Sequence, residues 1–439
     1  MNSLDLSGFA ANLRELVIIS AFDMPRDNHK SNKNTVAAVD EIRSHFPALQ
    51  RIHNGHPVAY FDGPGGTQVP TAVVEAMSDY LLNHNANTHW AYPSSYETDQ
   101  IIDDSRATIA DFLNASANEI VFGQNMTSLT FHLSRALGRG FRPGDEIVVT
   151  ELDHHANSDT WRALAKDRDL TIRVLPLNIE TGQLELDQLD GLVNKKTKLI
   201  AIGAASNILG TINEFEKVVM IARGVGALSF VDAVHYAAHE LIDVQKIGCD
   251  FLAGSAYKFY GPHIGILYGR RNLLDSIDFP KLRPAPDYSP DRMETGTQNH
   301  EGIAGAAAAV NFLASLTKDG TRREKLVIVF EELHQRQDEM FRNIWEGLSN
   351  IQGVTVYGPP PGSRRTSTVS FSVAGKSSDV VARELALAGI FASDGDFYAM
   401  TVTERLGVGG LVRAGLTCYS TIEEVERLVA GVRSIVNGA

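Results

Sequence analysis

The sequence predicts an α/β protein whose sheet is mostly parallel and is covered by helices on both faces. Between about residues 119 and 270, short apolar runs alternate with helix-like segments such as 158–168 and 214–225, the pattern of parallel strands joined by crossovers. The composition of the 439 residues, 44% hydrophobic and 21% charged, is that of a folded globular chain. The predicted strands are 119–122, 146–150, 171–176, 198–203, 227–232, 251–255 and 265–268.

Further elements are predicted on both sides of this region. Residues 1–35 are expected to form a loose arm, because 23–33 is polar and rich in turn-forming residues. An apolar stripe at Val36, Val39, Ile42 and Phe46 predicts a helix that begins near residue 36. After a proline-rich connector come two predicted helices, 303–316 and 323–348, and then strand and helix signals at 368–373, 380–388, 411–416 and 422–436 that predict a smaller α/β lobe.

Charge and cysteine content exclude several classes of protein. Forty basic and 53 acidic residues give a net charge of −13, which disfavours nucleic-acid binding through net charge. No apolar run approaches the roughly 20 residues that a membrane helix needs. The two cysteines, Cys249 and Cys418, cannot form a disulfide framework and fit a reducing compartment. We therefore expect a soluble cytoplasmic protein that binds neither nucleic acid nor membrane.

An acid and a lysine follow two neighbouring predicted strands. Asp232 ends the apolar strand 227–232, and Lys258 follows the strand 251–255 in an aromatic setting. A lysine in such surroundings can have the lowered pKa that imine formation requires. With a carboxylate to hold a pyridine nitrogen protonated, the pair could bind pyridoxal 5'-phosphate (PLP). On these two residues alone, an ordinary surface lysine and a capping aspartate remain the better interpretation.

A candidate phosphate site follows the first predicted strand. Residues 123–128, Gly-Gln-Asn-Met-Thr-Ser, lead into a helix-like segment at 129–137. Backbone N–H groups and hydroxyls where a loop enters a helix suit a phosphate. Taken singly, the segment is better interpreted as an ordinary helix N-cap.

Several longer stretches together resemble the cysteine desulfurase branch of the class V aminotransferase family, which are fold-type I PLP enzymes. They occur in the family's order between about residues 57 and 421. The matching stretches are YFDGPGGTQVP (60–70), NMTS (125–128), GDEIVVTELDHHAN (144–157), ASNILGTIN (205–213), VDAVHYAAH (231–239), GCDFLAGSAYKFYGPHIGILYG (248–269), ETGTQ (294–298) and VRAGLTCYST (412–421).

The resemblance implies a seven-stranded, mainly parallel sheet and a division into domains. A large PLP-binding domain would span 59–300, and a small C-terminal α/β domain with its connecting helices would span 301–439. Residues 36–58 would carry the N-terminal helix, which would pack on the small domain.

The resemblance also implies roles for individual residues. Lys258 would form the Schiff base and shuttle a proton, and Asp232 would pair with the ring nitrogen. His154 would be the second catalytic residue, lying against the ring face and assisting proton transfer. Arg413 would bind the substrate carboxylate, and Asn207 would lie near that carboxylate and the ring's phenolic oxygen. The phosphate would be held by Thr127, by the backbone of Asn125 and Met126, by Ser255 and Tyr257, and by Thr297 of a neighbouring protomer, so that a homodimer is expected.

Three positions depart from the desulfurase pattern. His235 stands where those enzymes commonly have glutamine, and Tyr257 stands where they commonly have histidine, although both can still donate a hydrogen bond. Desulfurases also carry a nucleophilic cysteine on a mobile loop fifteen residues before the carboxylate-binding arginine, and that position is Tyr398 here, within loop 393–399. We interpret Cys249 and Cys418 as packed apolar residues.

Other residue patterns give only weak evidence for a metal site or a substrate-binding role. His235 and His239 have metal-like spacing, but the order is not H-E-x-x-H and no third ligand is evident, so no metal site is predicted. Trp90, Tyr92 and Tyr96 could line a substrate entrance or pack under a loop.

The predicted function is a cysteine desulfurase-like C–S lyase that acts on an amino acid without a persulfide-forming loop cysteine. An aminotransferase or epimerase of the same family is the alternative. A catalytically silent PLP-fold binding protein is a third possibility, against which the joint presence of Lys258, Asp232 and Arg413 argues. The identity of the amino acid, and whether a partner accepts sulfur, stay open.

Overall fold

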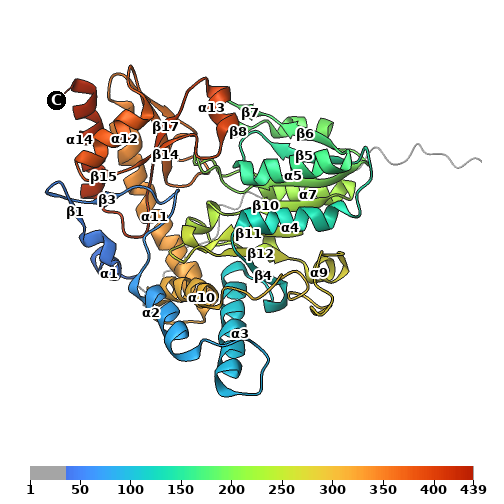
Figure 1. Cartoon of the computed structure of the whole chain (residues 1–439). Coiled ribbons are helices and arrows are strands. Elements are labelled where there is room, and N and C mark those ends of the chain that lie inside the picture. Colours follow the sequence, from blue (N-terminus) through green and yellow to red (C-terminus); the bar gives the residue numbers. More distant parts are fainter. Residues whose placement is uncertain (1–35, 439) are drawn as a thin grey trace, which may run out of the picture. The chain divides into compact units, whose positions relative to one another are not determined.

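The computed structural model describes residues 36–438, which contain a central seven-stranded sheet of order β4-β12-β11-β10-β9-β5-β6 (Figure 1). All neighbours in this sheet pair in parallel except β12, which is antiparallel to both β11 and β4. The prediction of a mainly parallel seven-stranded sheet is therefore confirmed. The strands are β4 (Ile120–Gly123), β5 (Glu146–Thr150), β6 (Thr171–Leu175), β9 (Thr197–Gly203), β10 (Leu228–Asp232), β11 (Phe251–Ser255) and β12 (Gly265–Gly269).

Helices bury both faces of this sheet because side chains alternate along each strand. Ile147 and Val149 of β5 pack in one core with α4 and α5, whereas Val148 packs in the opposite core with α7. The helices around the sheet are α2 (Thr71–Asp79), α3 (Pro93–Leu113), α4 (Met126–Gly138), α5 (His155–Arg168), α7 (Phe215–Val225) and α10 (His300–Ser315).

A smaller α/β lobe follows the long helix α11 (Arg322–Ser349) (Figure 1). Its antiparallel sheet has the order β13-β14-β17-β16, and its apolar core includes Phe371, Val412 and Leu428. The elements of this lobe are β13 (Val354–Tyr357), β14 (Thr368–Val373), α12 (Ser378–Leu387), β15 (Ile390–Phe391), β16 (Ser393–Gly395), α13 (Met400–Leu406), β17 (Leu411–Gly415) and α14 (Ile422–Asn437).

The N-terminal part of the described chain touches both lobes. Within the predicted helical segment, the α-helix α1 covers only Val39–Ser44, and a 3-10 turn, Pro47–Gln50, follows it. Arg43 donates to the Tyr419 carbonyl and to Glu424 at 2.9 Å, while Phe46 packs edge-on to Phe312 of α10. The predicted arm, residues 1–35, lies outside the described residues.

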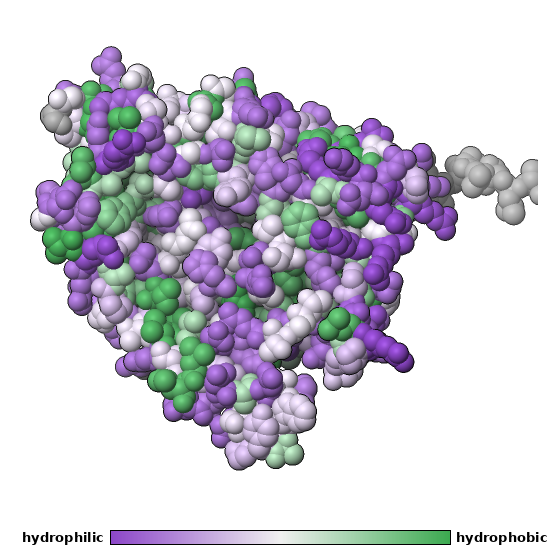
Figure 2. All heavy atoms as spheres, viewed as in Figure 1, coloured by the Kyte–Doolittle hydropathy of each residue, from purple (hydrophilic) through white to green (hydrophobic). Residues whose placement is uncertain are grey.

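An exposed apolar patch is formed by side chains between residues 74 and 96, from α2 through the turn Tyr80–His84 and the following loop to the start of α3. In Figure 2, hydrophobic atoms gather at the lower left, over the region of α2. The patch includes Leu82, 81% exposed, and Trp90, 62% exposed, together with Val74, Leu81, Tyr92 and Tyr96. Among residues 36–438 no helix has the length and apolar character needed to cross a membrane.

Candidate active site

A cavity of about 940 Å³ opens where the large sheet meets the small lobe, beyond the carboxyl ends of the parallel strands. One wall comes from the turns after β4, β5, β9, β10 and β11, and the other from residues 393–398 and β17. Eleven of the twelve residues that we single out from the sequence line it: Asn125, Met126, Thr127, His154, Asn207, Asp232, His235, Ser255, Tyr257, Lys258 and Arg413.

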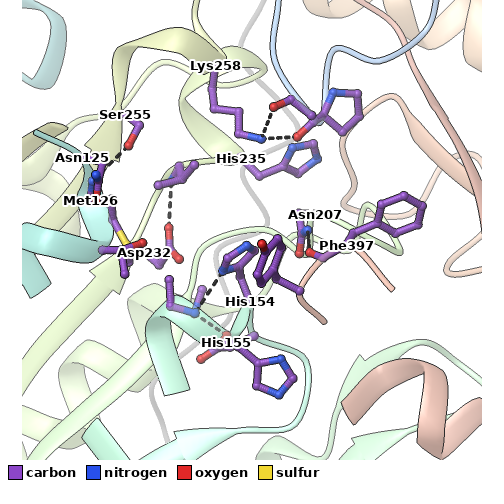
Figure 3. A pocket seen from close by; sticks show the side chains of 18 of the residues that line it. Asn125, Met126, His154, His155, Asn207, Asp232, His235, Ser255, Lys258 and Phe397 are labelled. Carbon is purple, nitrogen blue, oxygen red and sulfur yellow. Dashed lines mark hydrogen bonds between the residues drawn. The ribbon is translucent and has the colours of Figure 1, made fainter. Parts of the chain in front are cut away.

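Lys258 enters the cavity from the short 3-10 turn that follows β11 (Figure 3). Its Nζ donates to the backbone oxygen atoms of Pro64 and Gly65, the latter at 3.0 Å, and it lies 4.8 Å from the centre of the Tyr257 ring. Burial lowers the pKa of Lys258 to about 7, and the positive charge of Arg413 acts in the same direction. A substantial share of this amine is therefore neutral, and able to act as a nucleophile, near neutral pH.

Asp232 ends β10 and faces the same space as Lys258 (Figure 3). Its Oδ1 accepts a 2.9 Å hydrogen bond from the N–H of Val234, and burial raises its pKa to about 6. The carboxylate is thus mostly charged at pH 7. Among the described residues it forms no ion pair with Lys258, so the two groups converge on the cavity without neutralising each other directly.

His235 follows Asp232 and connects the cavity to the small lobe. Its Nε2 lies 3.1 Å from the hydroxyl of Thr366 and 3.2 Å from that of Thr368. Burial lowers the pKa of His235 well below its ordinary value, so the ring is neutral at pH 7. No group of three or more potential metal ligands occurs in the part of the chain that the structure describes.

The start of α4 presents hydrogen-bond donors to the cavity. Asn125 is its N-cap and accepts from the N–H of Ser128 at 2.8 Å, while the N–H of Met126 donates to the Ser255 hydroxyl at 3.1 Å. That bond uses the Ser255 oxygen as acceptor and leaves its hydrogen to donate. Gly265 of β12 permits this arrangement, because a Cβ there would come within 2.4 Å of the Asn125 carbonyl carbon.

His154 lies between the end of β5 and the small-lobe wall. Its Nδ1 accepts from the N–H of Ala156 at 3.0 Å, and its ring stacks on Tyr398 with 5.4 Å between ring centres (Figure 3). Burial lowers its pKa to about 4, assisted by Lys258, so the ring is neutral with its hydrogen on Nε2. Neighbouring Asp153, whose pKa burial raises to about 7, accepts from the N–H of Gly203 at 2.7 Å.

Arg413 projects from β17 into the cavity and is only 4% exposed. Its Nη1 donates to the carbonyl of Asn207 at 3.0 Å, and its Cζ lies 4.0 Å from the centre of the Phe397 ring. The Asn207 side-chain nitrogen donates to the carbonyl of Phe397 at 2.9 Å, while its buried Oδ1 has no hydrogen-bond partner among the described residues. Arg413 and Asn207 thus present unused polar atoms, Nε and Oδ1, at the same place.

Residues 393–399 form a wall that is held at several points. Phe397 and Tyr398 adopt left-handed conformations, with φ of 56° and 57°, and the Tyr398 carbonyl accepts from the N–H of His155 at 2.7 Å. The N–H of Tyr398 donates to Asp396 at 2.8 Å. This segment contains no cysteine.

Neither cysteine lines the cavity. Cys249 is fully buried and Cys418 is 4% exposed. Burial raises the pKa of each thiol to about 12, so both stay protonated at neutral pH.

Some residues singled out from the sequence lie elsewhere. Thr297 is exposed and does not line this cavity, and its predicted contact with a neighbouring protomer stays a prediction. Trp90 and Tyr96 are both 62% exposed and likewise do not line the cavity, so within this chain they neither frame the entrance nor pack under a loop.

Asp62, Asp153 and Phe397 also line the cavity, although their sequence patterns were not recognised as parts of a site. Asp62 precedes the Gly-Pro-Gly-Gly turn at 63–66, whose carbonyls receive Lys258, and its Oδ1 lies 3.6 Å from Nη2 of Arg413. A carboxylate directly before a glycine-rich turn was the sequence signal that could have identified Asp62. No sequence signal identified Phe397, because its position depends on how the small lobe folds against the sheet.

The donor set fits PLP. The cavity combines an amine with a lowered pKa, a charged carboxylate that the amine does not neutralise, and hydroxyls and amides at the start of a 13-residue helix. The unpartnered Oδ1 of Asn207 supplies a further acceptor. An aldehyde, a protonated ring nitrogen and a phosphate are the three groups that this set would bind.

Comparison with known proteins gives consistent matches. The model of the family "Aminotransferase class-V" matches residues 59–428. A cysteine desulfurase of Pectobacterium carotovorum is 34% identical over 413 residues, covering 90% of this chain and 98% of the relative. The solved apo structure of a cysteine desulfurase from Thermococcus onnurineus has a TM-score of 0.83 at 31% identity, covering 91% of this chain and 98% of that one. A cysteine desulfurase structure from Escherichia coli has a TM-score of 0.79 at 27% identity, covering 92% and 99% of the two chains.

Proposed function

Because this chain belongs to the class V aminotransferase family of PLP-dependent enzymes, we propose that it is a C–S lyase that cleaves the Cβ–S bond of a cysteine-like amino acid without using a thiol of its own. The observation that carries the proposal is the wall 393–399, where Tyr398 stacks on His154 and no thiol faces the cavity.

Lys258, Asp232, His235 and the start of α4 would hold PLP. When bound, PLP supplies the electron sink that lets an amino acid lose its α proton. The neutral amine of Lys258 would attach the coenzyme, and the carboxylate of Asp232 would keep its ring nitrogen protonated. Thr127, Ser255, Tyr257 and the backbone of Asn125 and Met126 would bind the phosphate, while His154 would lie against the ring and Asn207 near its phenolic oxygen.

The remaining steps use side chains of this chain directly. Arg413 binds the substrate α-carboxylate through its guanidinium, because Nε is buried and has no hydrogen-bond partner among the described residues. Lys258 takes the α proton, since an amine with a pKa near 7 can accept and return a proton at neutral pH. His154 is neutral and assists through Nε2.

The fate of the sulfur follows from the absence of an available thiol. Both cysteines are buried and protonated, so neither can attack a sulfur atom in the cavity. The leaving group therefore departs to solution. With cysteine and water, the net products of elimination are hydrogen sulfide, pyruvate and ammonia.

The test is a product analysis on PLP-loaded protein supplied with cysteine and related amino acids. We expect sulfide and pyruvate in equal amounts, no persulfide on the protein, and unchanged rates in a Cys249→Ser, Cys418→Ser double variant. A need for a keto acid to sustain turnover would identify an aminotransferase, loss of optical activity without sulfide would identify an epimerase, and tight PLP binding without turnover would identify a silent binding protein. Each of these three results would overturn the proposal.

We also propose that the active unit is a homodimer. The exposed apolar patch on α2 and the start of α3 supports this, because a surface of this kind is usually covered by another protein. Thr297, exposed and remote from the cavity of its own chain, would reach the phosphate bound by the neighbouring protomer. Light scattering should give twice the 47.8 kDa chain mass, and Leu82→Glu should lower that mass.

For location, we propose the cytoplasm. Two buried cysteines that form no disulfide support a reducing compartment. Fractionation of cells expressing the tagged chain would test this.

A further inference from the structure

Asp62 is the cavity-lining carboxylate that lies beside Arg413. Its Oδ1 is 3.6 Å from Nη2 of Arg413, a distance too long for a hydrogen bond. Arg413 uses its Nη atoms elsewhere, on the Asn207 carbonyl at 3.0 Å and on the Ser393 hydroxyl at 3.3 Å. Asp62 thus forms an ion pair with Arg413 without a hydrogen bond, and its Oδ1 is buried and has no hydrogen-bond partner among the described residues.

The backbone around Asp62 is fixed, so this carboxylate is held in place. Its carbonyl accepts the N–H groups of Gly65 and Gly66, both at 2.9 Å, and the residue forms a β-bridge to Gly415 at the end of β17. A Cβ on Gly65 would come within 2.3 Å of Oδ1 of Asp62. The glycine thus provides the room in which the carboxylate lies.

Asp62 also lies on the side of the cavity from which Lys258 enters. Nζ of Lys258 donates to the carbonyl of Gly65, three residues after Asp62. Although Oδ1 is buried, the side chain of Asp62 as a whole is 47% exposed, so its other atoms are accessible from the cavity that both cations line.

We infer that Asp62 binds the α-ammonium group of the incoming amino acid while Arg413 binds its carboxylate, an inference that rests on the proposed function. An amino acid carries these opposite charges on one carbon, and the neighbouring guanidinium and carboxylate are complementary to that zwitterion. An ammonium has three donors, and a carboxylate accepts hydrogen bonds through both of its oxygens, so the accessible part of Asp62 suits it. The same pairing selects against carboxylic acids without an amine. When such a ligand binds Arg413, its carboxylate is repelled by the negative charge of Asp62, and it has no ammonium group to compensate for that repulsion.

The experiment compares L-cysteine with 3-mercaptopropionate, which has the same thiol and carboxylate but no amine. For Asp62→Asn holoenzyme we expect the KM for cysteine to rise about tenfold or more, as for a lost charged hydrogen bond. The Kd of 3-mercaptopropionate, measured by calorimetry, should stay the same or fall. Gly65→Ala, which displaces the carboxylate but keeps its charge, should also raise the KM, and Asp62→Glu should partly restore it.

Asp159→Asn is the matched control, because Asp159 lines the same cavity but lies 3.8 Å from Arg162 on its own helix. This variant should alter neither the KM for cysteine nor the Kd of 3-mercaptopropionate. If Asp62→Asn weakens both ligands by the same factor, Asp62 only orients Arg413 and this inference is overturned while the proposed function stands. A parent holoenzyme that binds neither ligand overturns both.

Discussion

The two walls of the cavity are built in different ways. On the large-sheet wall, Asp232 and Lys258 follow neighbouring strands in parallel register, and Ser255 ends the second of these strands. On the small-lobe wall, Phe397 and Tyr398 occupy a left-handed turn held by side chains from the other wall, such as Asn207. Under the proposed function, the first wall would hold PLP and the second would contact the substrate. Departures from the desulfurase pattern occur on both walls: His235 and Tyr257 lie on the first, whereas the second keeps the motif residue Arg413 but has Tyr398 in place of the loop cysteine.

Replacing Lys258 should have the largest effect, because it removes the amine on which the sheet wall depends. We expect Lys258→Ala to lower turnover by about 10³-fold or more and to abolish covalent attachment of PLP. Borohydride reduction followed by mass spectrometry measures that attachment. Lys246→Ala, on the short helix α8 (Val244–Ile247), is the control and should keep the adduct. An adduct that persists in Lys258→Ala would refute the assignment.

The pH dependence of PLP loading should show the lowered pKa of the same amine. Only the neutral amine reacts, so the rate of loading should rise with pH up to about 7 and then level off. Below pH 7 it should fall about tenfold for each pH unit. Stopped-flow absorbance of apoprotein mixed with PLP measures this. A rate that keeps rising toward pH 10 would mean that burial does not lower the pKa of Lys258.

A substitution of Arg413 tests the small-lobe wall, which we propose binds the substrate. Arg413→Lys keeps the charge but loses the planar pair of donors, so we expect the KM for the amino acid to rise about 10- to 100-fold while PLP attachment stays intact. Steady-state kinetics and the borohydride assay separate the two effects. A loss of attachment equal to that in Lys258→Ala would show that the walls are not independent.

Sequence patterns predicted the sheet wall well. All seven strands of the large sheet begin and end within one residue of their predicted bounds, and 146–150 and 251–255 match without change. Local apolar runs specify such strands because each is buried on both faces. Asp232 and Lys258 could be paired because residues after neighbouring parallel strands meet at one edge of the sheet.

The small-lobe wall could be predicted only in part. Arg413 was identified through its motif, and loop 393–399 was noted for its missing cysteine. The stacking of Tyr398 on His154, the Phe397 ring beneath Arg413 and the carboxylate of Asp62 were not expected. The contacts of Tyr398 with His154 and of Asp62 with Arg413 join residues more than 240 positions apart, and Phe397 and Arg413 lie on either side of α13, so no local periodicity encodes them.

The smallest expected effect concerns Tyr398, where the two walls touch. Its side chain is 73% exposed, so its main contact is the stack on His154. Losing an aromatic pair worth about 0.5–1.5 kcal/mol should make Tyr398→Ala about 2- to 10-fold slower in kcat/KM, while Tyr398→Phe, which keeps the ring, should be within about twofold of the parent. Kinetics of both variants, with PLP content measured in parallel, provide the comparison. Equal losses in the two variants would mean that the hydroxyl acts on the substrate, and the wall would then supply a chemical group in place of the missing thiol rather than only a surface.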